Sequence, residues 1–306
     1  MKYTGRADGK DAELAVEREG LRLGPRFVDY ADVASLRPIN HRVFVDLLDG
    51  RTVEISMLGF SYDGFWDELT ESFGKRSLEA LFAEEPPLMR CEGEYAIPGE
   101  SGRGRIALLP DAVCVLPQTR RALRIPLCFT REIRRDGYLL HFLLRSGASC
   151  TVGRMGYDTE PFAERAAQAA DRVKKQRSAA LATTPVNGPF TEKGLFRTAQ
   201  PEQYWNAAYG AGVCALELFT GEDAATYLYR FDEPRERFSW MLEEAMEAVG
   251  VHRELIFLSE EKLAEKPLYR MAAARSEAVR FLRARSAGRL IHSAGHAERL
   301  LAFLNG

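Results

Sequence analysis

The sequence predicts an α+β protein in which two tandem β-rich units, each closed by a C-terminal helix, precede an α/β layered domain. An internal repeat spans the first two thirds, each copy ends in a hairpin signal followed by an amphipathic helix, and strands alternate with helices in the last third. The units are placed at 1–90, at 91–186 including a linker, and at 187–306. A chain of 306 residues has the length of two or three ordinary domains.

The repeat is clearest between the segments 47–69 and 144–166, which align without a gap when 97 is added to the first numbering. The positions that agree are glycines and large apolar residues in the same order: Gly50 with Gly147, Ile55 with Val152, Gly59 with Gly156, Phe60 with Tyr157 and Phe65 with Phe162. Self-similarity of this kind indicates that one structural unit occurs twice.

Each copy is predicted to contain strands followed by one helix. Asp49-Gly50 and Ser146-Gly147 stand between alternating apolar runs, and such dipeptides favour tight hairpin turns. Apolar residues then recur at helical spacing, at Phe65, Leu69 and Phe73 in the first copy and at Phe162 and Ala166 in the second. Gly64 and Gly74 predict a weak first helix, broken near Gly74. The glycines Gly99, Gly102 and Gly104 predict a loop before the next strand.

The polar, proline-containing segment 177–189 indicates the boundary to the third unit. AGVCALELF and ATYLYRF predict a hairpin, and Pro234 opens a helix that buries Phe238, Leu242 and Val249. RELIFLS (253–259) is predicted to be a strand, 268–288 one long helix, RLIH (289–292) a short strand and 296–304 a last helix. The alternation favours an α/β or α+β layer structure.

The strand order, the Asp/Ser-Gly turn, the hydrophobic-Gly-aromatic segment and the helix with an early Phe together resemble the bacterial pleckstrin-homology-like (PH-like) domains. The resemblance covers 13–85 and 93–177. It implies two β-barrels, each closed by a C-terminal helix. PH-like domains bind phosphoinositides, peptides or protein partners and are seldom catalytic, so the resemblance implies a binding or scaffold module.

Composition and charge narrow the functional classes to which the protein can belong. The net charge of −2 argues against a nucleic-acid binder, and apolar runs are too short for a membrane helix. The N-terminus has no apolar signal core, so a cytoplasmic protein is expected. The five cysteines form no CxxC pair, and Cys114, Cys128 and Cys150, which lie within apolar runs, are interpreted as buried hydrophobes. The sequence contains no phosphate-binding loop, no nucleophile elbow and no HExxH motif, and no cofactor is expected. His292 and His296 are four residues apart, but they lie on either side of a predicted strand–helix boundary. They would therefore not share one helix face, and no metal site is predicted.

Arginine clusters are the remaining candidates. Arg120, Arg121 and Arg124 in the second copy are the candidate anion site, for an anionic lipid headgroup or another anion. A second cluster covers the predicted long helix 268–288 and the start of the strand after it, and is interpreted as a solvated face: Arg270, Arg275, Arg280, Arg283, Arg285 and Arg289. Residues 1–90 carry 12 basic and 17 acidic side chains, and residues 91–186 carry 15 and 10, so the two copies are expected to attract each other.

The sequence therefore favours a non-catalytic binding or scaffold protein with protein partners and no nucleic acid. Binding is expected through loop ends or the open sheet edge of a PH-like unit. The alternative is an enzyme whose active site lies in the third unit, with the PH-like pair as a targeting or regulatory arm. Its weak catalytic candidates are Glu217, Arg289 and His292, at predicted strand ends where layered α/β proteins often bind ligands.

Overall fold

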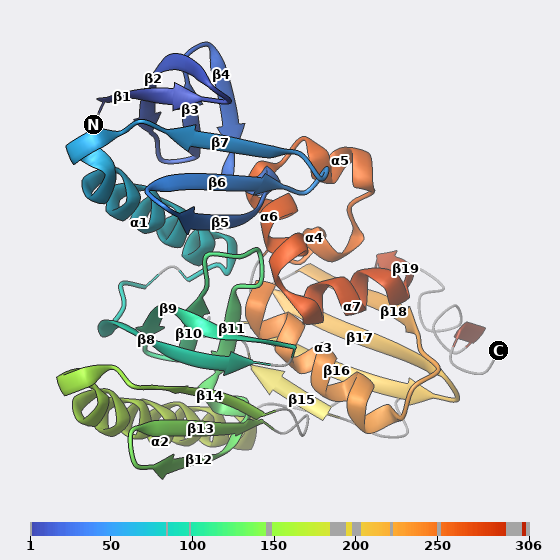
Figure 1. Ribbon diagram of the computed structural model, residues 1–306. Coiled ribbons are helices and arrows are strands. Elements are labelled where there is room, and N and C mark those ends of the chain that lie inside the picture. Colours follow the sequence, from blue (N-terminus) through green and yellow to red (C-terminus); the bar gives the residue numbers. More distant parts are fainter. Residues whose placement is uncertain are drawn as a thin grey trace.

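The computed structural model describes residues 2–83, 85–97, 99–144, 149–183, 194–197, 203–220, 223–249, 252–291 and 302–303. It is a mixed α+β structure with two large antiparallel sheets of seven strands and a third sheet of five strands (Figure 1). No helix within these ranges is long and apolar enough to cross a membrane.

The two large sheets have the same strand order, β4-β3-β2-β1-β7-β6-β5 in the first and β11-β10-β9-β8-β14-β13-β12 in the second. The first contains β1 (Lys2–Ala7), β2 (Lys10–Val16), β3 (Gly20–Leu23), β4 (Arg26–Asp29), β5 (Val33–Ile39), β6 (Arg42–Leu47) and β7 (Thr52–Ser56). The second contains β8 (Met89–Ile97), β9 (Glu100–Leu108), β10 (Ala112–Leu116), β11 (Leu123–Pro126), β12 (Thr130–Asp136), β13 (Leu139–Leu144) and β14 (Ser149–Gly153).

The predicted loop around Gly102 and Gly104 is wrong, because both residues lie within β9. Only Gly99 lies in the turn before it, with a φ of +79°. A side chain at Gly104 would bring its Cβ to 3.1 Å from the carbonyl oxygen of Leu116 on the neighbouring strand. Glycine at this position therefore permits close strand approach rather than chain reversal.

Helix α1 (Tyr62–Ala80) follows the first sheet and is continuous through Gly74, so the predicted break is wrong. Its apolar stripe is buried against the sheet, where Phe65 meets Tyr3 edge-on at 5.1 Å between ring centroids and Phe73 meets Tyr30 at 5.5 Å. Aromatic contacts of this geometry stabilise a pair beyond its buried area, and together they outweigh the roughly 1 kcal/mol helix cost of one glycine. In the second copy, α2 (Thr159–Thr183) buries Phe162 and Ala166 in the equivalent way.

The third sheet is an antiparallel meander of β15 (Gly194–Arg197), β16 (Gln203–Gly210), β17 (Val213–Thr220), β18 (Asp223–Arg230) and β19 (Ser286–Ile291). Between β18 and β19 lie α3 (Arg235–Val249), α4 (Glu254–Phe257), α5 (Glu260–Ala264), α6 (Pro267–Arg275) and α7 (Glu277–Arg285). The helix opened by Pro234 is confirmed, with Phe238, Leu242 and Val249 buried.

Two predictions in the third unit are wrong. The segment predicted as the strand 253–259 contains the helix α4. The predicted long helix is divided at Ser276, whose hydroxyl accepts a hydrogen bond from the Val279 amide at 3.3 Å and so caps α7. Most of the predicted last helix, 296–304, lies outside the described residues.

The third unit shares a continuous apolar core with the first copy. Phe82, just after α1, stacks on the imidazole of His252 at 4.5 Å and meets Tyr269 of α6 edge-on at 5.9 Å. Arg270 of α6 forms an ion pair at 3.0 Å with Asp32, in the short 3₁₀ helix after β4. Consequently, the helices between β18 and β19 contact the first copy as well as their own sheet.

The two copies meet through apolar packing. Leu78 and Leu81 at the end of α1 lie in one buried cluster with Ala107 of β9 and with Ala112, Cys114 and Leu116 of β10. All five residues of β10 are buried, because Val113 and Val115 face the other way, into the core of the second copy. The burial of apolar side chains is therefore enough to explain the contact between the copies, and their opposite net charges are not needed for it.

Arg275, at the end of α6, lies where all three units meet. Its side chain is 3% exposed, its guanidinium carbon is 4.7 Å from the centre of the Phe73 ring in α1, and Nη1 donates to the Thr119 carbonyl of the second copy at 3.2 Å. Burial lowers its pKa to about 9. The interpretation of this residue as part of a solvated face is therefore wrong.

Replacing Arg275 with Ala is expected to lower the free energy of unfolding by about 2–4 kcal/mol, because a desolvated cation–π contact, a charged hydrogen bond and packing are lost together. Arg275→Met keeps the apolar volume and removes the buried charge, so it should lose at least about 1 kcal/mol less. Urea denaturation measures both, with Arg103→Ala on the exposed part of β9 as the control. Equal free energies of unfolding for R275A and R103A would contradict the conclusion that Arg275 stabilises the contact between the three units.

Candidate functional site

The residues of the enzyme alternative are only partly described. His292 and His296 lie outside the described residues, and for Glu217 only the backbone of β17 is described. In the sheet register Glu217 pairs with Thr226, whereas Arg289 pairs with Tyr227, so the two positions are one row apart. Arg289 is exposed on β19. The enzyme alternative stays a prediction.

The arginines of the predicted anion site occupy different environments. Arg124 is 9% exposed at its side chain and pairs with Asp111 at 2.6 Å, so it serves the second sheet itself. Arg120 is exposed, and its backbone amide donates to the Ala34 carbonyl of the first copy at 2.8 Å. Arg121 is half-buried beside Gly99.

The two arginine clusters approach each other. The guanidinium of Arg280 has its pKa lowered by burial and, further, by the positive charges of Arg120 and Arg121, against the opposing effect of Glu277. Other members of the second cluster have acidic partners: Arg283 pairs with Glu260, and Arg285 pairs with Glu233 at 2.7 Å. The surface near Arg280 is basic, while three of the six arginines of the second cluster, Arg270, Arg283 and Arg285, pair with carboxylates.

The outer edges of the two large sheets are used differently. At the first edge, β5 receives an extended segment of the second copy: Leu36 donates to the Gln118 carbonyl at 2.7 Å, and Arg120 donates to Ala34 at 2.8 Å. Ser35 and Thr119 thereby form an antiparallel bridge. At the second edge, β12 is the outermost strand, seen at the bottom of Figure 1, and pairs only with β13 within the described ranges.

Strand β12 presents the same backbone groups as β5. Both strands have a bulge at the same repeat position, between Val33 and Ser35 and between Thr130 and Glu132. The pairs Leu36–Val45 and Ile133–Phe142 are also equivalent. The repeat therefore places the Arg131 carbonyl and the Ile133 amide of β12 where Ala34 and Leu36 of β5 bind their extended segment.

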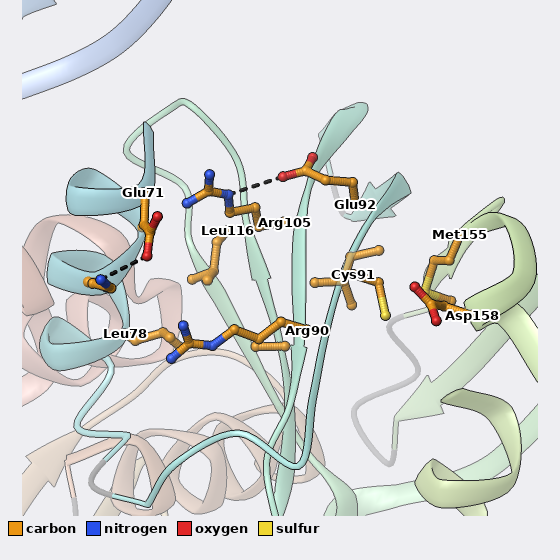
Figure 2. A pocket seen from close by; sticks show the side chains of 13 residues that line it. Glu71, Leu78, Arg90, Cys91, Glu92, Arg105, Leu116, Met155 and Asp158 are labelled. Atoms are coloured by element: carbon orange, nitrogen blue, oxygen red, sulfur yellow. Dashed lines mark hydrogen bonds and ion pairs between the residues drawn. The ribbon is translucent and has the colours of Figure 1, made fainter. Parts of the chain in front are cut away.

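A cleft of about 500 Å³ lies between α1 and strands β8–β10, and we name it the seam cleft. Its lining comprises Glu71, Gly74, Lys75, Leu78, Arg90, Cys91, Glu92, Arg105, Ile106, Ala107, Leu116, Met155 and Asp158. Figure 2 shows Leu78, Arg90 and Arg105 at the end beside α1, and Cys91, Met155 and Asp158 toward the other end. The first copy provides one wall of the cleft and the second copy provides the rest.

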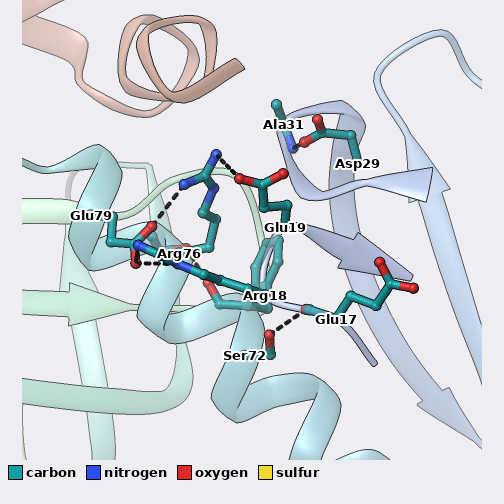
Figure 3. Close-up of polar contacts among 10 residues, drawn as sticks. Glu17, Arg18, Glu19, Asp29, Ala31, Ser72, Arg76 and Glu79 are labelled. Carbon is teal, nitrogen blue, oxygen red and sulfur yellow. Dashed lines mark hydrogen bonds and ion pairs between the residues drawn. The ribbon is translucent and has the colours of Figure 1, made fainter. Parts of the chain in front are cut away.

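The wall formed by α1 is held in place by a polar network against the β2–β3 hairpin (Figure 3). Ser72 donates from its hydroxyl to the Glu17 carbonyl at 2.8 Å. The buried Arg76 pairs with Glu79 at 2.7 Å and approaches Glu19 at 3.9 Å, and Arg18 reaches the same Glu79 carboxylate at 2.9 Å. Because Ser72 and Glu79 of α1 bond to Glu17 and Arg18 of the hairpin, the last turns of α1 have a fixed rotation relative to the cleft.

The five cysteines are all free, and Cys91, Cys114, Cys150 and Cys214 are buried, which confirms the interpretation of Cys114 and Cys150 as core residues. Cys128 is half-buried. Cys91 differs from the others because it also lines the seam cleft. Burial and the nearby carboxylate of Asp158 raise the pKa of its thiol to about 11.

The comparisons with known proteins add no relative. No protein-family model matches this chain, and no curated protein matches it. The cleft and the two sheet edges therefore stand on their own geometry.

The sequence did not indicate the seam cleft, because its walls come from different copies. Arg90 and Arg105 were not among the candidate residues. The register of β8 against β9 could have suggested them, since Glu92 pairs with Arg105 and Arg90 with Ala107. That register required knowing that β9 starts at Glu100.

The alkylation of Cys91 by iodoacetamide should depend on pH differently from that of an ordinary cysteine. With a pKa of about 11, its thiolate fraction and hence its rate should rise about tenfold per pH unit from pH 7 to pH 10. The same cysteine in the urea-unfolded chain should level off near about pH 9. Peptide mass spectrometry measures both rates, and levelling near pH 9 in the folded protein would contradict the raised pKa.

Proposed function

We propose that this chain is a non-catalytic binding or scaffold protein, in which paired PH-like modules, each a barrel closed by its helix, capture an extended acidic segment of a protein partner along β12. The single observation that carries the proposal is the occupied edge of β5. The chain itself adds residues 118–120 to that edge, and the equivalent edge of the second copy offers the same backbone groups.

Main-chain pairing supplies affinity in this mode of recognition, and side chains supply selectivity. Five of the seven residues of β12 are exposed and charged: Arg131, Glu132, Arg134, Arg135 and Asp136. Arg131 is the bulged residue, and the other four follow it. Arg135 is neutralised by Glu160 at 2.5 Å. Among the other exposed charges, Arg131 and Arg134 favour carboxylates on the incoming strand, whereas Glu132 and Asp136 oppose them, so the preference for an acidic segment rests on the net positive charge of the second copy.

The charges of β12 also limit unwanted pairing. Charged side chains on an edge strand oppose aggregation between copies of a sheet. They do not prevent a short, selected pairing, because β5 carries Arg37 and Pro38 and still binds residues 118–120. The second copy, with its net positive charge, is thus suited to an acidic partner segment.

The test selects binders from a displayed library of short random peptides against the full chain, and measures them by fluorescence anisotropy. Selected peptides should be acidic and β-prone. Arg131→Glu with Arg134→Glu should weaken binding at least about tenfold, since charged contacts contribute about 1.5 kcal/mol or more. Methylating alternate backbone amides of the peptide should abolish binding.

The matched control is Arg103→Glu, an exposed arginine on β9 away from the β12 edge. It should bind the selected peptides as the parent chain does. Equal affinity for the parent and the R131E/R134E variant, or a selection that yields no acidic extended peptide, would overturn the proposal.

A further inference from the structure

The seam cleft combines an apolar surface with a charged end. Leu78 from α1 and Ala107 and Leu116 from β9 and β10 are buried side chains that line it. At about 500 Å³ the cleft falls within the range of small-molecule sites, which are mostly apolar with a few placed polar groups.

Charges at the end beside α1 do not cancel. Lys75 pairs with Glu71 at 2.8 Å, and Arg105 pairs with Glu92 at 3.0 Å. Arg90 is exposed on β8 and forms no hydrogen bond or ion pair with the described residues. The Glu71 carboxyl, whose pKa is lowered chiefly by Lys75, also responds to Arg105 and Arg90. At this end of the cleft three cations therefore meet two carboxylates and one positive charge is left over, while the third carboxylate of the lining, Asp158, lies toward the other end (Figure 2).

The sheet register brings these groups to one place. Glu92, Arg105 and Leu116 form one row across β8, β9 and β10, and Arg90 lies opposite Ala107 in a nearby row on the same face. A ligand head near Arg90 and Arg105 would therefore have apolar side chains of the same face beside it, with Leu78 opposite.

We propose that the seam cleft binds a small amphiphilic anion, with its phosphate or carboxylate head at Arg90 and Arg105 and its apolar body against Leu78, Ala107 and Leu116. The anion supplies the negative charge that the two carboxylates at this end leave unbalanced, and the body lies against the apolar side chains of the lining. A guanidinium suits both head groups because it donates two parallel hydrogen bonds to either. This site is separate from the β12 edge.

Four probes with the same chain test the head group: octyl phosphate, octanoate, octanol and octylammonium, titrated into the full chain by calorimetry. The two anions should bind, while octanol and octylammonium should bind at least about tenfold more weakly. The better of the two anions identifies whether phosphate or carboxylate is the preferred source.

Two variants test the cleft itself. Arg90→Glu should weaken binding of the better anion at least about tenfold. Gly74→Leu should narrow the cleft, because a Cβ at this position already lies 3.9 Å from the Arg105 side chain and the longer leucine side chain extends beyond it; leucine also favours helix. Arg134→Glu, outside the cleft, should bind normally, and this also separates the site from the β12 edge.

Binding of octanol as tight as that of octyl phosphate would overturn the proposed head-group recognition. Unchanged anion binding by R90E or by G74L would place the ligand elsewhere and overturn the proposal. Absence of binding by both anions would do the same.

Discussion

The buried guanidinium of Arg275 is the contact on which the arrangement of the three units depends. It covers Phe73 of the first copy and donates to Thr119 of the second, while its own helix belongs to the third unit. A buried charge is costly unless its environment compensates it. Here an aromatic face and one carbonyl provide part of that compensation, only when all three units are in place, and Nε and Nη2 remain buried without a hydrogen-bond partner among the described residues. The same contact holds residues 118–120 against β5, so the closure of the first sheet edge depends on it as well.

Burial of β10 on both faces is the second constraint. A strand covered on one side alternates apolar and polar residues, but AVCVL is apolar throughout because α1 covers one face and the second core covers the other. The two copies therefore cannot be equivalent in their surroundings, although their strand orders are the same. In the contact between the copies, the first copy contributes the C-terminal end of α1, and the second copy contributes the outer face of β9 and β10.

The sequence indicated what depends on short-range periodicity and missed what depends on packing between distant segments. The hairpin at Asp49-Gly50 and the stripe of Phe65, Leu69 and Phe73 follow from local patterns, and both are present. Strand β1 was missed although Asp8-Gly9 is the same turn signal, because the polar run KYTGRA has no apolar alternation. Gly74 and the segment 253–259 were misread because burial overrode their intrinsic preferences. The roles of Arg275 and Arg90 were not predictable, since each depends on a side chain from another unit.

Duplication gives this fold a comparison within one chain, and the differences between the copies carry the functional argument. The edge strand β5 of the first copy is paired with residues 118–120, whereas β12 of the second copy is open within the described residues. The two strands have the same bulge position and the same register. They therefore differ in their surroundings and not in their backbone geometry. The seam cleft arises from the opposite circumstance, since neither copy alone has both walls. One surface is thus inherited from the repeated unit, and the other is created by stacking the units. A mutation that separates the copies should remove the cleft and leave β12 intact, whereas a mutation within β12 should leave the cleft unchanged.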